Sequence, residues 1–96
     1  MKYLVREYYT VKNDEWYFDW GMRNFYIYYG KENTEQSRFT SMPDPSDDFV
    51  KAFGFDTKDE ANELMADIVG MGHEKYESHT LEETAVVAFD EEWFSV

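Results

Sequence analysis

Five carboxylates recur at helical spacing in the second half of the chain. On a helical wheel of segment 57–70, drawn at about 100° per residue, they fall within about 100° of arc. They are Asp56, Asp59, Glu60, Glu63 and Asp67. Carboxylates gathered on one side of a helix attract cations and basic side chains. This acidic stripe is therefore the first candidate site.

The spacing of the stripe carries an energetic cost. Like charges four residues apart on a helix repel by roughly 0.2–0.5 kcal/mol per pair. Three such pairs are present: Asp56 with Glu60, Asp59 with Glu63, and Glu63 with Asp67. The helix dipole favours acids in the first turn but disfavours Asp67 near the C-terminal end. Two interpretations stay open: a solvated face, and a surface whose repulsion is relieved by a basic partner.

The charge density of the stripe is comparable to that of a nucleic-acid strand. From Asp56 to Asp67 the helix spans about 16 Å, over which one DNA strand places about five phosphates. Other acids could extend this field: Asp44, Asp47, Asp48, Glu82, Glu83, Asp90, Glu91 and Glu92. We predict that the stripe, together with Glu91 and Glu92, binds a partner.

Other kinds of chemistry are poorly represented in the sequence. The chain has no cysteine, which excludes thiolate zinc sites and cysteine nucleophiles. His73 and His79 match no metal-ligand spacing, and we interpret them as solvated or hydrogen-bonded residues of a loop. No serine stands in a nucleophile elbow, and each glycine is interpreted as a bend or a helix stop. We therefore expect no catalytic residue, no metal, no cofactor and no enzymatic activity.

Charge divides the chain into two halves. Residues 1–43 carry six basic and six acidic groups, a net charge of zero, whereas residues 44–96 carry three basic and fifteen acidic groups, a net charge of −12. Direct binding to nucleic acid or to an anionic membrane is therefore disfavoured, and a basic protein partner is favoured. No apolar run approaches the roughly 20 residues of a membrane span, so we expect a soluble protein. Because small secreted domains usually contain disulfides and this chain has no cysteine, we expect it in the cytoplasm.

The first half is predicted to form strands. Residues 2–12 alternate as in a half-buried strand, with Tyr3, Val5, Tyr9 and Val11 on one face and Glu7 as an exception on that face. A hairpin turn is expected at 13–15. The apolar phase flips within 16–30, which indicates either a bulge or a tight turn between two short strands; we favour a long strand bent at Gly21. Residues 30–37 are expected to be a turn, and 38–41 a short third strand.

The second half is predicted to hold two helices and a last strand. Ser46 is expected to cap a short helix through Phe53, with Gly54 as its stop. Thr57 and Glu60 have the spacing of a capping box that opens a main amphipathic helix ending at Gly70. Residues 71–83 give no clear signal, and 84–89 are predicted to be a strand.

These elements predict a single α+β domain over residues 1–96. A three-strand meander and a C-terminal strand would form a small antiparallel sheet, packed on the main amphipathic helix and the short helix. Such an arrangement would leave the acidic stripe on the outer side of the main helix.

Aromatic residues make up 20% of the chain and are interpreted mainly as core. An alternative candidate surface nevertheless draws on them. Four could line an exposed sheet face: Tyr8, Trp20, Tyr26 and Tyr28. Because the first half lacks a basic groove, protein contact or self-association as a homodimer is the expected use of such a face.

The segment Phe55-Asp56-Thr57-Lys58-Asp59-Glu60-Ala61, after a predicted hairpin in a short acidic chain, resembles a class of small phage and mobile-element proteins. That class includes anti-defence proteins of the anti-CRISPR and anti-restriction type that mimic DNA. The resemblance implies an inhibitor of a basic nucleic-acid-binding protein, such as a host-defence nuclease complex, acting in a bacterial cytoplasm. It rests on size, charge and one helix start, and it assigns no site residue.

Overall fold

The structure is a computed structural model that describes residues 1–11, 24–39, 44–70 and 79–90. The predicted turn at 13–15 and bend at Gly21 lie outside these residues. So do Trp20, His73, Glu91 and Glu92, together with residues 40–41 of the predicted third strand.

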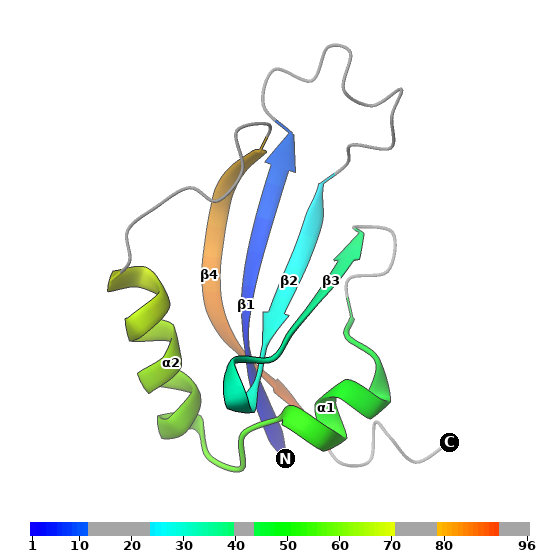
Figure 1. The fold of residues 1–96 in the computed structure, drawn as a ribbon, viewed down its shortest axis with the longest axis vertical. Helices are drawn as coiled ribbons and strands as arrows, with labels where there is room; N and C mark the ends of the chain where they lie inside the picture. Colours follow the sequence, from blue (N-terminus) through cyan, green and yellow to red (C-terminus); the bar gives the residue numbers. More distant parts are fainter. Residues whose placement is uncertain (12–23, 40–43, 71–78, 91–96) are drawn as a thin grey trace.

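Four strands form one antiparallel sheet (Figure 1). In the order β3-β2-β1-β4, the strands are β3 Glu35–Phe39, β2 Phe25–Tyr29, β1 Lys2–Val11 and β4 His79–Phe89. The chain also forms the helices α1 Asp47–Phe53 and α2 Lys58–Gly70 and a short 3-10 turn, η2 Lys31–Asn33. The predicted α+β class, and the return of the last strand to the sheet, are confirmed.

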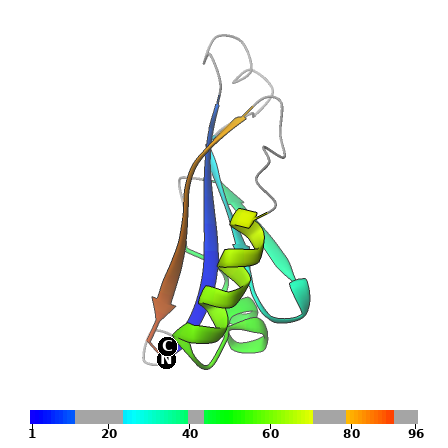
Figure 2. The same ribbon diagram turned by 90° about the vertical axis from the view of Figure 1, so that its left-hand side faces the viewer.

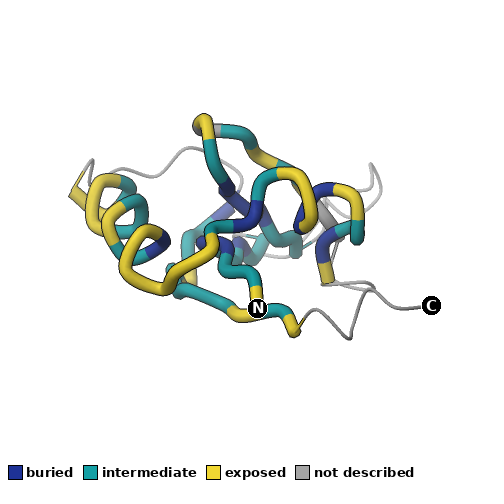
Figure 3. The backbone as a smooth tube through the Cα atoms, turned by 90° about the horizontal axis from the view of Figure 1, so that it is seen from below, coloured by how far each residue is buried: buried dark blue, intermediate teal, exposed yellow. Residues whose placement is uncertain are grey.

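The two helices cover opposite faces of the sheet. Because side chains alternate along a strand, odd and even residues of β1 enter different cores. The first core joins β1 and β2 to α2 through Val5, Tyr9, Ile27, Tyr29 and Ala61. The second joins them to α1 through Leu4, Tyr28, Phe49 and Val50. Seen from below, α2 lies on one side of the strands and α1 on the other (Figure 3), and α2 runs beside β1 (Figure 2).

The second face of β1 corrects one expectation. We predicted a half-buried strand with a polar outer face, and Arg6 and Thr10 do share that face. Leu4 lies on the same face, however, and is fully buried against α1. The face is therefore core where α1 covers it and polar beyond the helix.

Both edge strands begin earlier than predicted. β3 starts at Glu35, not at Arg38, because Glu35 to Ser37 pair with Tyr29 to Ile27 of β2. β4 starts at His79, not at Thr84, because its first residues pair with the last residues of β1. In both segments, backbone pairing with a neighbour outweighs the polar character of the side chains, which the local pattern alone does not reveal.

Both helix starts are confirmed. Ser46 Oγ accepts a hydrogen bond of 3.2 Å from the Phe49 N–H at the start of α1. Thr57 Oγ1 accepts a hydrogen bond of 3.3 Å from the Glu60 N–H and donates one of 2.9 Å to the Glu60 carboxylate. This capping pair sets the first turn of α2 and orients Glu60.

The exception in the β1 pattern is a buried carboxylate. Glu7 is only 2% exposed, and it accepts hydrogen bonds from the Tyr9 hydroxyl at 3.1 Å and the Tyr29 hydroxyl at 2.5 Å. Burial, aided by the hydrogen bond to Glu7 and the charge of Glu7, raises the pKa of Tyr29 well above its usual range. Tyr29 therefore remains a hydrogen-bond donor, and β1 is tied to β2 inside the core.

We predict that Tyr29→Phe lowers the free energy of unfolding by about 1–3 kcal/mol, because a buried carboxylate loses a donor. Tyr8→Phe is the matched control: Tyr8 is half-buried and lies on the opposite face of β1 from Glu7, so loss of its hydroxyl should cost no more than about 0.5 kcal/mol. Urea denaturation of both variants measures the difference. Equal stabilities would show that Tyr29 does not support Glu7.

A second pair of variants tests the cap of α2. Thr57→Ala should cost about 1 kcal/mol of folding free energy, because the Glu60 N–H loses its acceptor. Thr57→Ser keeps the hydroxyl and should retain most of that stability. Urea denaturation again provides the measurement, and an equal loss in the two variants would argue against the cap.

Candidate functional site

A short backbone bridge positions the base of α2. The Tyr3 N–H donates to the Phe55 carbonyl at 2.9 Å, and the Phe55 N–H donates to the Tyr3 carbonyl at 2.8 Å. This pair joins the segment between the helices to the start of β1. It thereby fixes where α2 begins and places the Phe55 ring beside it.

A close backbone approach positions the segment facing α2. A Cβ atom on Gly30 would lie 2.4 Å from the Phe53 carbonyl oxygen, so only glycine lets the end of β2 pack against the end of α1. Gly30 is thus a packing contact, which corrects its interpretation as a simple bend. The chain then turns through Glu32, whose φ of 60° lies in the left-handed region.

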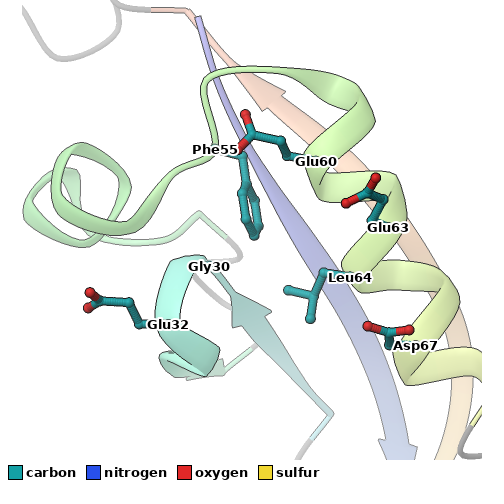
Figure 4. A pocket seen from close by; sticks show the side chains of 7 residues that line it. All are labelled: Gly30, Glu32, Phe55, Glu60, Glu63, Leu64 and Asp67. Atoms are coloured by element: carbon teal, nitrogen blue, oxygen red, sulfur yellow. The ribbon is translucent and has the colours of Figure 1, made fainter.

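These segments enclose an open depression of about 260 Å³. Its lining residues are Gly30, Glu32, Phe55, Glu60, Glu63, Leu64 and Asp67. Figure 4 shows the three acids of α2 along one wall, with Phe55 and Leu64 between that wall and Gly30. The Glu32 carboxylate points away from α2 (Figure 4), so the charge of the depression comes from α2. We call this feature the acidic groove.

The carboxylates of the predicted stripe differ in their electrostatic surroundings. Asp56 lies 2.5 Å from Lys2 Nζ and 3.6 Å from Lys31 Nζ, and the hydrogen bond from Lys2 lowers the pKa of Asp56. Within the described part of the chain, Glu60, Glu63 and Asp67 have no lysine or arginine nitrogen within 4.0 Å. Among the described residues, the acids of the groove thus have no basic partner, whereas the charge of Asp56 is offset by two lysines.

The structure brings together only part of the predicted site. Glu60, Glu63 and Asp67 line the groove, whereas Asp59 is exposed and does not line it, and Asp56 is held in ion pairs. The apolar floor of Phe55 and Leu64 and the opposing wall at Gly30 were not predicted from the sequence. Residues this distant in sequence meet only through the sheet and the Tyr3–Phe55 bridge, so no local pattern points to them.

The alternative aromatic surface is only partly exposed. The Tyr8 and Tyr26 rings stack with centroids 4.6 Å apart, and the Arg6 guanidinium lies 5.1 Å from the centre of the Tyr26 ring. Both tyrosines are half-buried. Tyr28 is 1% exposed and belongs to the core against α1, so the expectation that it lies on an exposed face is wrong.

His79 is also placed differently from the expectation. It is buried in β4, not in a loop, and its ring meets the Phe25 ring edge-on at 4.8 Å between centroids. Across residues 1–11, 24–39, 44–70 and 79–90, no three histidine, aspartate or glutamate residues are grouped so that they could hold a metal ion. In the same residues, no helix is long and apolar enough to cross a membrane.

Comparison with known proteins gives no assignment of this site. No protein-family model, no curated protein and no solved structure matches the chain. The functional interpretation therefore rests on the geometry and charge of the acidic groove.

Proposed function

We propose that this chain is a non-catalytic acidic inhibitor that binds a basic nucleic-acid-binding protein, such as a nuclease of a host-defence complex. Glu60, Glu63 and Asp67 would occupy positions on that partner that normally receive phosphates. The observation that carries the proposal is the acidic groove, in which three carboxylates without a basic partner in the described part of the chain border an open depression.

The composition of the groove suits an arginine or lysine side chain. Such side chains bury an apolar stem while keeping the charged head in a polar setting. Phe55 and Leu64 offer an apolar floor for the stem, and the α2 carboxylates can accept hydrogen bonds from the head. A basic protein that presents its phosphate-binding side chains matches both features.

The spacing along α2 supports mimicry of a short phosphate run. From Glu60 to Asp67 the helix rises about 10 Å, a length that holds about three phosphates of one DNA strand. Three carboxylates over this length give a density comparable to that of the backbone that they would replace. The −12 charge of residues 44–96 adds a wider attractive field.

Charge removal in the groove tests the proposal. In Glu60→Gln/Glu63→Lys/Asp67→Lys, glutamine retains the capping interaction with Thr57 while the groove loses its negative charge. We expect this triple variant to lose most of the basic partner captured by the parent from nuclease-treated bacterial lysate. In the parent, rising salt should release the partner and added DNA should displace it, because the contact is electrostatic.

The control changes the same amount of charge elsewhere. The control variant is Asp44→Lys/Asp48→Lys/Glu82→Gln. It makes the net charge of the chain five units more positive, which is the same change as in the groove variant. Asp44, Asp48 and Glu82 are exposed and lie outside the groove. The control should retain capture, with both folds checked by circular dichroism. Equal retention by the two variants would refute the groove as the site.

A second candidate function uses the stacked pair Tyr8 and Tyr26 as a protein-binding surface. It is favoured by the stack of the two rings, which is partly exposed. This reading predicts salt-insensitive capture that Tyr26→Ala abolishes. Capture that is unchanged in Tyr26→Ala would exclude it.

A further inference from the structure

Phe55 places an aromatic ring in the acidic groove. The residue is half-buried: it packs against the core between the sheet and α2, and it also lines the depression. One part of the ring therefore rests on the core, while another part is open to the groove between α2 and Gly30 (Figure 4). Leu64 continues this apolar floor along α2. A cation that enters the groove thus contacts an aromatic surface as well as carboxylates.

The backbone that carries this ring is held in place on every side. Phe55 itself forms the two-way bridge to Tyr3. Before it, the Gly54 N–H donates to the Val50 carbonyl at 2.8 Å, and after it, Asp56 is held by two lysines. The position of the ring is therefore set before a ligand arrives, which lowers the cost of ordering the site on binding.

The acids along α2 suit a cation that carries several donors in one plane. The Thr57 hydroxyl orients Glu60, and along the helix Glu63 lies about 4.5 Å further on, with Asp67 about 6 Å beyond it. An arginine guanidinium holds its five N–H donors in one plane, so it can stack on a ring and still donate to carboxylates beside that ring. A lysine ammonium has three donors on one strongly hydrated nitrogen, so it gains less from the same ring.

We propose that the groove selects arginine over lysine and that Phe55 determines this preference. The inference rests on the proposed function, because it names the side chain of the basic partner that enters the groove. Charge complementarity selects a cation, since the groove acids have no basic partner over the residues that the structure describes. The guanidinium lies against the Phe55 ring and donates to the α2 carboxylates, while the apolar stem lies on Leu64.

Two peptides of equal charge test the preference on the unaltered chain. The isotopically labelled chain is titrated with hexa-arginine and with hexa-lysine, and the amide shifts of Gly30 and Leu64 give a dissociation constant for each peptide. Hexa-arginine should bind at least about two- to fivefold more tightly, the contribution of one exposed cation–π contact. Equal dissociation constants would overturn the inference and leave the proposed function intact. No saturable binding of either peptide would contradict both.

Two variants of Phe55 assign the preference to its ring. Phe55→Leu keeps an apolar floor without the ring, and it should bring the two dissociation constants close to each other. Phe55→Tyr keeps the ring and should retain the preference of the parent, with both folds checked by circular dichroism. In the parent, arginine side-chain protons of the bound peptide should also shift upfield, because they lie over a ring. An arginine preference that persists in Phe55→Leu, or the absence of that upfield shift, would overturn the role of Phe55.

Discussion

The buried hydrogen bonds of Glu7 constrain the arrangement of the whole sheet. A buried carboxylate is tolerated only where donors reach it, and here they come from Tyr9 on the same strand and Tyr29 on β2. Sliding β1 by one residue would move Glu7 to the other face and away from the Tyr29 hydroxyl. The register that satisfies Glu7 also sends Val5 toward α2 and Leu4 toward α1. The two-sided packing thus depends on a polar contact inside an apolar core.

This packing gives the two sides of α2 different surroundings. The Tyr3–Phe55 bridge holds the base of the helix, and the close approach at Gly30 brings the opposing wall near it. Glu60, Glu63 and Asp67 consequently border a depression with an apolar floor. Lys2 and Lys31 pair with Asp56 at the base of the helix, and over the residues that the structure describes no lysine or arginine pairs with the groove acids.

Local patterns predicted those elements that local interactions determine. Both helices and their caps were predicted because Ser46 and Thr57 act within one turn of their partners. The early starts of β3 and β4 were missed because pairing with distant strands, not side-chain alternation, decides them. The acidic wall of the groove was predicted, because helical periodicity placed its acids on one stripe. The rest of the lining was not, because Gly30 and Phe55 reach the groove only through tertiary packing. The pairing of Asp56 with Lys2 is likewise non-local.

The central claim is that the groove, rather than negative charge in general, binds basic side chains. A titration of the isotopically labelled chain with a hexa-arginine peptide, followed by amide chemical shifts, tests it most directly. We predict saturable shifts centred on Gly30, Leu64 and Asp67 that diminish as salt is added. Shifts spread equally over the other acidic segments, such as Asp44–Asp48, or no saturation at Gly30 and Leu64, would contradict the account.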